Sequence, residues 1–400
     1  MVKVFLCCLL IVAVSVALLG DLARMNKFVG FFALFAAIFG GSTENPRASD
    51  SLRLVTVWFR HGARTPELKD SYPNDPYQED TFQPEGWGQL TNNGKQMAFD
   101  LGKLLRKRYD HYLGDVYTPD LIKATTTDYD RTKMSLLLTL AGLFAPSLSQ
   151  KWHDTLDWMP IPYDYDKEEH DHILTRPNKY CPVYFNELQR VLASEETVAY
   201  LNSHRNTTEY IEQHTGKPMK TLGHGFQIFQ TLTAEYTMNL TLPEWTAEVF
   251  PDKVTEFAVK QCEMENHNTI LKKLNGGRSL QRVIRHMREK AEGIHQPDGR
   301  KMYLNSGHEF GVLRLLAALN LYKPHFPNYC AAAIIELHYL EKEQDYAVKV
   351  VHVDNVYKEP NELQVPGCDL FCPLNQFIEL TKEHVPNNYT QECGSSIYLD

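Results

Sequence analysis

The sequence predicts an α/β protein with a mixed, mainly parallel sheet flanked by helices, and with a mostly helical cap subdomain. Three segments carry this prediction, because each runs from an apolar strand through a short polar motif into a helix: residues 55–64, 121–131 and 302–309. Parallel strands connected by helices are the usual outcome of such a repeat. Two further strand-like stretches, 331–340 and 347–353, are predicted to form a hairpin that makes the sheet mixed.

The length of the chain and the changes in its local composition predict a core with one large insertion. Its 400 residues suffice for about two to three domains, or for one large domain with an insertion. Strands and helices alternate over 52–151 and again over 263–400, which we assign to the α/β core. Residues 152–262 are rich in aromatic, histidine and polar residues, with helix-like spans and no clear strand. This intervening segment is therefore predicted to be the helical cap.

The N-terminal region is predicted to be an export signal. Apolar runs cover 5–19 and 28–39, and each is shorter than the about 20 residues that a spanning helix requires. We interpret 1–42 as the leader, with Met25 as an alternative start, and 43–51 as a flexible lead-in. The mature protein is then expected to be secreted and to lack a stable membrane span. The alternatives are a lysosomal location or an N-terminal membrane anchor built from both apolar runs.

The cysteines and glycosylation motifs agree with export. Two of the eight cysteines lie in the leader, and an even number remains: Cys181, Cys262, Cys330, Cys368, Cys372 and Cys393. Six cysteines in an exported chain favour three disulfides, with fifteen possible pairings. Three asparagines stand in N-glycosylation motifs, namely Asn206, Asn239 and Asn388. The formal net charge of −9 argues against nucleic acid as a partner.

The motif Arg60-His61-Gly62-Ala63-Arg64-Thr65-Pro66 follows directly after the first predicted strand. Arginine forks suit oxyanions such as phosphate. A neutral imidazole is a competent nucleophile near neutral pH, so His61 is the predicted nucleophile. Gly62 is expected to let the backbone approach the bound anion closely. The motif therefore predicts a loop that binds phosphate and attacks it.

Two later motifs are expected to reach the same place. Arg131 falls in the first turn of a predicted helix that Asp128 or Asp130 is expected to cap. A helix dipole disfavours a cation there, so either a bound anion or a neighbouring aspartate must explain it. His308 and Glu309 follow the third strand. Because sites in open α/β sheets form beyond the carboxyl ends of the strands, we expect all three motifs to surround one anion.

The motif Arg-His-Gly-x-Arg-x-Pro resembles the signature of the histidine acid phosphatases. Residues 127–135 resemble a second segment of that family, and 306–309 resemble the histidine–glutamate form found in venom acid phosphatases. The resemblance extends over about residues 52–393. It implies the histidine phosphatase fold, hydrolysis of phosphate monoesters through a phosphohistidine on His61, and a homodimer. No cofactor is expected, and no metal is required, because the arginines supply the positive charge that a metal would otherwise bring.

Charge and acid–base chemistry suggest the roles within such a site. Glu309 would serve as the general acid, in place of the aspartate of many family members. Four side chains would bind the phosphoryl group, namely Arg60, Arg64, Arg131 and His308. A glutamic acid suits low pH, so an acidic optimum is expected. The alternative for Glu309 is a purely structural interaction with the helix dipole.

The same resemblance bears on the disulfides and on the substrate. It implies the pairs Cys181–Cys393 and Cys368–Cys372. Cys262 and Cys330 are then left over and are expected to bridge each other. The substrate would be a small phosphomonoester or a phosphoprotein. The alternatives are a phosphatase for inositol phosphates or lysophospholipids, and a secreted binding protein with weak catalysis.

Overall fold

The computed structural model describes residues 51–399. The predictions for the leader (1–42), and those for the lead-in (43–51) apart from Ser51, lie outside these residues. Within them, no helix is both long enough and apolar enough to cross a bilayer.

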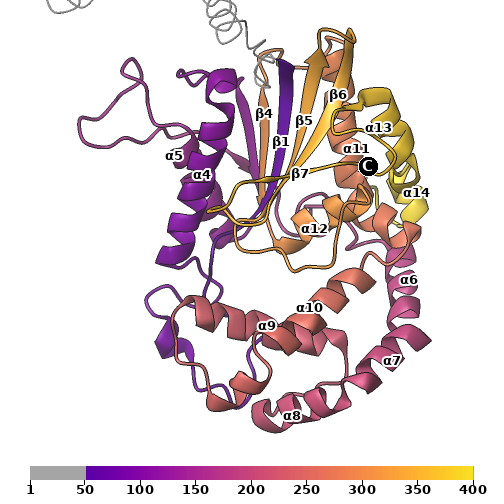
Figure 1. Cartoon of the computed structure of the whole chain (residues 1–400). Helices are drawn as coiled ribbons and strands as arrows, with labels where there is room; N and C mark the ends of the chain where they lie inside the picture. Colours follow the sequence, from indigo (N-terminus) through magenta and orange to yellow (C-terminus); the bar gives the residue numbers. More distant parts are fainter. Residues whose placement is uncertain (1–50, 400) are drawn as a thin grey trace, which may run out of the picture. The chain divides into compact units, whose positions relative to one another are not determined.

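A mixed sheet of eight strands is the centre of the described structure (Figure 1). Its strands are β1 (Leu52–Arg60), β2 (Ile122–Thr126), β3 (Asp164–Tyr165), β4 (Met302–Gly307), β5 (Ala332–Leu340), β6 (Asp345–Val353), β7 (Asn361–Leu363) and β8 (Cys372–Pro373). The order is β3-β2-β4-β1-β5-β6-β7, with β8 also beside β6. The first four strands are parallel, whereas β5 to β8 pair in antiparallel fashion. The predicted mixed sheet and its hairpin are thereby confirmed.

Helices cover both faces of this sheet (Figure 1). One face packs against α4 (Asn92–Leu113) and α5 (Asp130–Leu143), and the other against α11 (Thr269–Ala291), α12 (Glu309–Ala318) and α13 (Leu374–Thr381). Alternate residues of β1 serve the two faces, with Val55 and Val57 on the α4 side and Leu54 and Trp58 on the α11 side. The core is therefore two apolar layers, one on each side of β1.

The sequence pattern predicts a helix that Thr91 caps and that ends in the basic stretch 106–108, and the observed α4 begins at this cap but ends later. Thr91 is its N-cap, and the Thr91 side chain accepts a hydrogen bond from the backbone N–H of Gly94. The helix then continues to Leu113, beyond the basic residues Arg106 and Arg108.

Between α5 and α11 the chain is mainly helical. Its elements are α6 (Pro182–Leu192), α7 (Glu195–Ser203), α8 (Arg205–Thr215), α9 (Leu222–Thr237), η3 (Glu244–Glu248) and α10 (Asp252–Met264). These helices have their own apolar clusters, one around Phe257 and one around Ile228 and Val254. Before them, β3 pairs with β2, so part of the range 152–262 belongs to the sheet. The exact limits of the cap stay a prediction.

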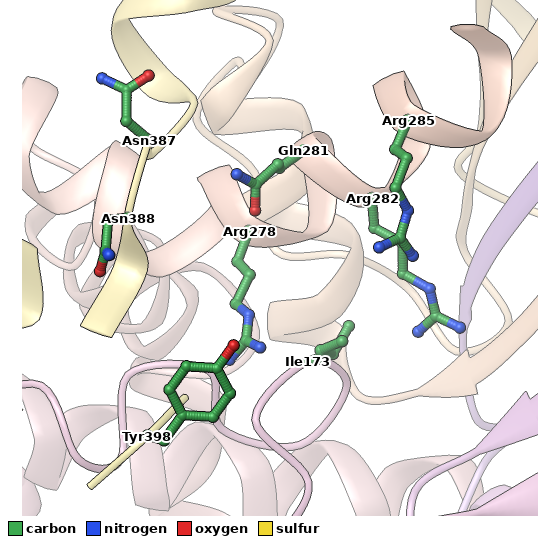
Figure 2. Close-up of a pocket in the computed structure, with 8 residues that line it drawn as sticks. All are labelled: Ile173, Arg278, Gln281, Arg282, Arg285, Asn387, Asn388 and Tyr398. Atoms are coloured by element: carbon green, nitrogen blue, oxygen red, sulfur yellow. The ribbon is translucent and has the colours of Figure 1, made fainter. Parts of the chain in front are cut away.

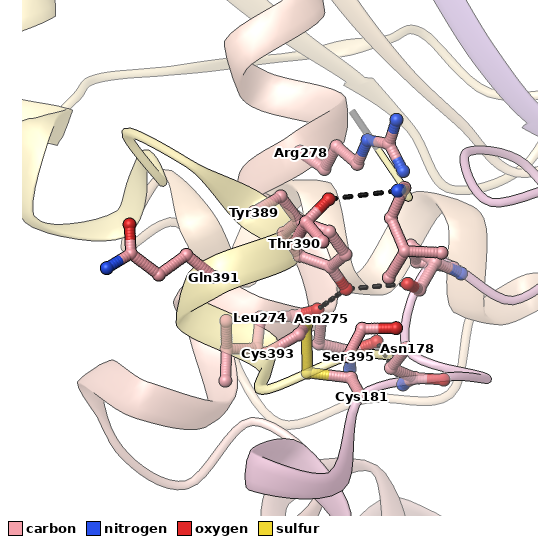
Figure 3. The surroundings of a disulfide bond; sticks show 12 residues. Asn178, Cys181, Leu274, Asn275, Arg278, Tyr389, Thr390, Gln391, Cys393 and Ser395 are labelled. Atoms are coloured by element: carbon pink, nitrogen blue, oxygen red, sulfur yellow. Dashed lines mark hydrogen bonds between the residues drawn. A yellow bond between two sulfur atoms is a disulfide. The ribbon is translucent and has the colours of Figure 1, made fainter. Parts of the chain in front are cut away.

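Two disulfides form as the resemblance implies, Cys181–Cys393 and Cys368–Cys372. The first joins the N-cap of α6 to the last residue of α14 (Tyr389–Cys393), 212 positions away in sequence (Figure 3). Beside it, the buried hydroxyl of Tyr389 donates to the carbonyl oxygens of Pro177 and Leu274, at 2.6 and 2.7 Å. These contacts fix the start of α6 against α11.

The predicted disulfide between Cys262 and Cys330 is wrong. Both residues are buried free thiols in the structure. Cys262 lies in α10, whereas Cys330 packs in the apolar layer between the sheet and the helices α4 and α5. The two residues thus belong to different packing units. Burial raises the pKa of both thiols, so they stay protonated and unreactive.

Strand register brings the carboxyl ends of three strands to one edge of the sheet. Arg60, the last residue of β1, pairs with Gly307, the last residue of β4. Thr126 at the end of β2 pairs with Ser306 on the other side of β4. The polar motifs that follow these strands therefore begin side by side, as the sequence predicts.

Candidate active site

His61 is held by backbone contacts on both sides of its loop. Its N–H donates to the carbonyl oxygen of Gly307 at 2.9 Å, and its own carbonyl oxygen accepts from Cys330 at 3.2 Å. The next residue, Gly62, packs directly on α4, because a Cβ there would lie 2.1 Å from the carbonyl oxygen of Gly94. The close approach predicted for Gly62 is therefore made to the start of a helix. It fixes the nucleophile loop on the α4 layer.

One nitrogen of the His61 ring is committed to the backbone. Nδ1 lies 2.8 Å from the carbonyl oxygen of Gly62, and since a carbonyl only accepts, Nδ1 carries the proton. The other nitrogen, Nε2, then bears the lone pair of the neutral ring. Burial and the positive charges of Arg131 and Arg60 hold the pKa of His61 well below its usual value. The ring is thus a neutral nucleophile even in acid.

Arg60 and Glu309 form a buried ion pair. The Nε of Arg60 lies 3.2 Å from Oε2 of Glu309, with side-chain exposures of 2% and 9%. The other oxygen of Glu309 accepts from Nε2 of Gln230 at 2.9 Å. Arg60 is further fixed by the carbonyl oxygen of Pro327 at 2.7 Å and by the ring of Tyr329 at 4.1 Å. The glutamate therefore has a defined position at the N-terminus of α12.

Arg64 and Arg131 share one carboxylate. Oε1 of Glu67 lies 3.0 Å from Nη2 of Arg131 and 3.7 Å from Nη2 of Arg64. Although burial alone would raise it, the charges of Arg131 and Arg64 lower the pKa of Glu67 to about 2. Glu67 is therefore ionised at any working pH. Asp70 lies 4.0 Å from Arg64, and burial together with the charge of Glu67 raises its pKa to about 6.

His308 is the N-cap of α12, and both of its ring nitrogens have neighbours. Nε2 lies 3.3 Å from the hydroxyl of Thr127, and Nδ1 lies 3.5 Å from Nη2 of Arg131. Because a guanidinium only donates, Nδ1 is the acceptor in this arrangement and Nε2 carries the proton. The His308 ring also meets those of Tyr129 and His61, with centroids 4.9 and 5.6 Å away. Its hydrogen bond to phosphate, expected from the sequence, would have to replace one of these contacts.

These motifs open into one cavity of about 330 Å³. Five of the six predicted site residues line it, namely His61, Arg64, Arg131, His308 and Glu309, and Arg60 lies behind Glu309. The cap contributes Tyr184, Phe185 and Leu188 from α6, and Phe226 and Gln230 from α9. Neither Asp128 nor Asp130 caps α5, because Tyr129 occupies the N-cap position. The anion site is thus built from the carboxyl edge of the sheet and roofed by helices.

Sequence reasoning did not identify Gln230 or Glu67. Gln230 is 4% exposed among the buried residues Ile228, Phe229 and Leu232 of α9, and a polar side chain at the spacing of these apolar residues is a usable signal. Glu67 stands three positions after Arg64, within reach of an ion pair. His224 stands between two glycines, where the sequence alone would allow it to line a pocket, but it is not among the lining residues.

A second cavity of about 450 Å³ lies along the outer part of α11 (Figure 2). It contains three arginines of one helix, Arg278, Arg282 and Arg285, but its lining includes no histidine or carboxylate. This lining therefore offers neither an imidazole nucleophile nor a carboxylic acid. The cavity at His61 is therefore the candidate active site.

Comparison with known proteins agrees with this site. The family described as "Histidine phosphatase superfamily (branch 2)" matches residues 51–353, which contain all six predicted site residues. The chain belongs to the histidine phosphatase superfamily. Within this superfamily it is 38% identical to the venom acid phosphatase of Apis mellifera over 363 residues, covering 90% of both chains. It is 32% identical to the lysosomal acid phosphatase of Homo sapiens, covering 87% of this chain and 81% of the relative.

A solved structure shows the same fold. The phytase of Klebsiella sp. ASR1 superposes with a TM-score of 0.66, covering 88% of this chain and 99% of the phytase. Its sequence identity is 13%, so this likeness concerns the fold alone. The predicted histidine phosphatase fold is confirmed.

Proposed function

We propose that this protein is an acid phosphatase that hydrolyses phosphate monoesters through a phosphohistidine on His61. The observation that carries this proposal is the hydrogen bond from Nδ1 of His61 to the carbonyl oxygen of Gly62. It leaves Nε2 as the atom with a lone pair, on a residue that lines the arginine-rich cavity. The named acid phosphatases among its relatives support the same reaction.

The first step transfers the phosphoryl group to the enzyme. Nε2 of His61 attacks phosphorus, the bond from phosphorus to the ester oxygen breaks, and the Glu309 carboxyl gives its proton to the leaving oxygen. In the second step water attacks phosphorus and gives a proton back to Glu309, and the phosphorus–nitrogen bond breaks. Inorganic phosphate leaves and the enzyme is regenerated.

Positive charge stabilises both transfers. Arg64 reaches the cavity from the loop after β1 and Arg131 from α5, and their charges act on the transferring phosphoryl oxygens. Before substrate binds, Glu67 partly neutralises both guanidinium groups. A bound phosphate would compete with Glu67 for them. Arg60 acts from behind by orienting Glu309.

Trapping of the intermediate tests the proposal. The enzyme is mixed with a radiolabelled phosphomonoester and quenched in alkaline denaturant, because phosphorus–nitrogen bonds hydrolyse in acid. We expect label on the peptide that contains His61, and its loss in His61→Ala. The exposed His170 supplies the matched control, since His170→Ala should keep both label and turnover.

The competing hypothesis is a binding protein that has kept the site with little catalysis. It predicts that inorganic phosphate binds to the wild type while no label and no turnover are found. That outcome would overturn the phosphatase proposal. Label on a residue other than His61 would overturn the assignment of the nucleophile.

The walls of the cavity indicate the class of monoester. Phe185 and Leu188 of α6 and Phe226 of α9 give the lining an apolar and aromatic part beside its charged residues. We infer that the organic part of the substrate is at least partly apolar, such as an aryl phosphate or a phosphotyrosine side chain. The Phe185→Ala variant should then raise KM for an aryl phosphate about tenfold and change KM for a short alkyl phosphate little.

Secretion and N-glycosylation are parts of the proposal. The acceptor residues Asn206, Asn239 and Asn388 are all exposed, which supports modification. Asn388 uses its side-chain oxygen to accept from the N–H of Gln391, and that leaves its nitrogen available for a glycan. Loss of mass on enzymatic deglycosylation would test this. The homodimer stays a prediction.

A further inference from the structure

A cluster of metal-binding side chains lies outside the phosphate cavity. His325 belongs to the loop between α12 and β5, His352 lies in β6, and Asp354 follows the end of that strand. One possible ligand atom from each lies within 4.8 Å of the others. We propose that these three side chains form a site for a divalent transition metal, with zinc as the preferred ion, which fixes the loop beneath Arg60.

One ring nitrogen of each of the two histidines lacks a hydrogen-bond partner among the described residues. Nε2 of His325 and Nε2 of His352 are both buried, and neither has a hydrogen-bond partner among residues 51–399. His352 is 7% exposed, so solvent does not satisfy its nitrogen. A buried polar atom without a partner costs free energy, unless a ligand binds there. Two such nitrogens beside one carboxylate form a set of metal ligands.

The tautomer of His325 is already the one that a metal requires. Its Nδ1 lies 2.6 Å from the carbonyl oxygen of Lys323, which only accepts a hydrogen bond, so Nδ1 carries the proton. In the neutral ring the lone pair is then on Nε2. Ligation through one nitrogen, with the other donating to a carbonyl, is the usual arrangement for metal-bound histidine.

The carboxylate is held in a similar way. Oδ1 of Asp354 accepts from Nδ2 of Asn328 at 3.1 Å, which leaves Oδ2 for the metal. Zinc bonds to histidine nitrogen and carboxylate oxygen at about 2.0–2.2 Å, so tetrahedral ligand atoms lie about 3.4 Å apart. Because the three ligand atoms lie within 4.8 Å of one another, the side chains need to approach by at most about 1.4 Å. Two imidazoles and one carboxylate suit zinc, with water as the fourth ligand.

The site is connected to the active site by one short segment. Directly after His325, the ring of Phe326 lies 5.1 Å from the guanidinium of Arg60. Pro327 accepts a hydrogen bond from Arg60, and the Tyr329 ring lies 4.1 Å from the same guanidinium. A metal that joins His325 to the end of β6 would therefore immobilise the support of Arg60. Its role is positioning, at a distance from the bond that breaks.

Zinc binding is tested on the whole mature glycoprotein after removal of metals by a chelator. Calorimetric titration with zinc should give one site per chain, and cobalt should give the visible absorption bands of a tetrahedral Co²⁺ ion. His325→Ala and Asp354→Asn should each weaken binding at least tenfold. Asp354→Asn is the sharper variant, because asparagine keeps the oxygen that accepts from Asn328. The control His170→Ala removes an exposed histidine elsewhere and should bind zinc as the wild type does.

Two further measurements can overturn the proposal. If His325→Ala and Asp354→Asn bind zinc like the wild type, or if the wild type binds none at millimolar zinc, there is no such site. Zinc held instead by His61 and His308 would inhibit turnover and would survive both variants. The coupling to Arg60 predicts that zinc lowers the inhibition constant of inorganic phosphate about two- to fivefold in the wild type only. Binding without that change would overturn the positioning role.

Discussion

Oε2 of Glu309, which lines the phosphate cavity, lies 3.2 Å from the Nε of Arg60 behind it, and both side chains are buried. Arg60 ends β1 and Glu309 begins α12, so the pair joins the first and third motifs of the site. Gln230 of the cap donates to the other oxygen of the same carboxylate. The position of the proposed acid therefore depends on the core and on the cap together.

Replacing the proposed acid Glu309 should lower kcat by an amount that depends on the leaving group of the substrate. Glu309→Gln cannot donate a proton, so kcat for an alkyl phosphate should fall about 10²–10⁴-fold. A nitrophenyl phosphate, whose leaving group needs little protonation, should lose far less. Steady-state kinetics on both substrates measure the difference. Glu309→Asp is the control, since it keeps a carboxyl group and should keep more activity. An equal loss on both substrates would indicate a structural role for Glu309.

The sequence alone identifies the part of the site that strand order dictates. His61, Arg131 and His308 each follow a strand whose carboxyl end reaches the same edge, and the register of β1 and β2 with β4 brings them together. Each of these residues belongs to one local unit of strand, polar motif and helix, so the sequence pattern and the chemistry of the side chains suffice to predict its place in the site. The predicted start of α4 at Thr91 succeeded for the same reason, because capping is local.

Long-range contacts are what the sequence does not supply. Gln230 reaches Glu309 across 79 positions, and nothing local in α9 indicates which core residue it meets. The predicted pairing of Cys262 with Cys330 failed because counting cysteines ignores which packing unit each residue joins. The aspartates expected to cap α5 are used elsewhere, since Asp128 forms an ion pair with Lys133. In each case tertiary packing overrides the local pattern.

Removing the carboxylate between two arginines should strengthen anion binding. Glu67 stays ionised, because Arg131 and Arg64 outweigh its burial and lower its pKa to about 2. In Glu67→Gln both guanidinium groups are released for the ligand, and the inhibition constant of inorganic phosphate should fall about three- to tenfold. Inhibition kinetics at several pH values measure this. The exposed Glu79→Gln should have no effect. If the inhibition constant of inorganic phosphate rises instead, so that phosphate binds more weakly, Glu67 chiefly orients Arg131.

A buried pair of carboxyls should make the protein more stable in acid. Burial raises the pKa of Glu235 in α9, as does the charge of Asp75, and burial also raises the pKa of Asp75. Unfolded carboxyls lose their protons near pH 4 to 5, whereas the folded pair holds a proton to higher pH. Above that range the folded state binds more protons than the unfolded state, so the free energy of unfolding falls as pH rises.

Glu235→Gln tests this dependence, because the amide has no proton to lose. The fall in Tm between about pH 5 and pH 8 should become smaller in this variant, which gains on the order of 1–2 kcal/mol relative to the wild type at the higher pH. Thermal unfolding followed by circular dichroism measures it. Glu244→Gln changes an exposed carboxyl near the same helices and should leave the slope unchanged. An unchanged slope in Glu235→Gln would show that the pair is ionised in the folded state.

Alkylation of thiols should distinguish the cysteines of the two disulfides from the two free cysteines. When unreduced protein is denatured and alkylated, peptides with Cys262 and Cys330 should carry the label, because both thiols are free. The cysteines of the two disulfides should be labelled only after reduction. The double variant Cys181→Ala/Cys393→Ala should unfold about 2–5 kcal/mol more easily, since it loosens the start of α6. Cys262→Ala removes no bridge and should cost less. A linked peptide pair containing Cys262 and Cys330 would contradict the structure at this point.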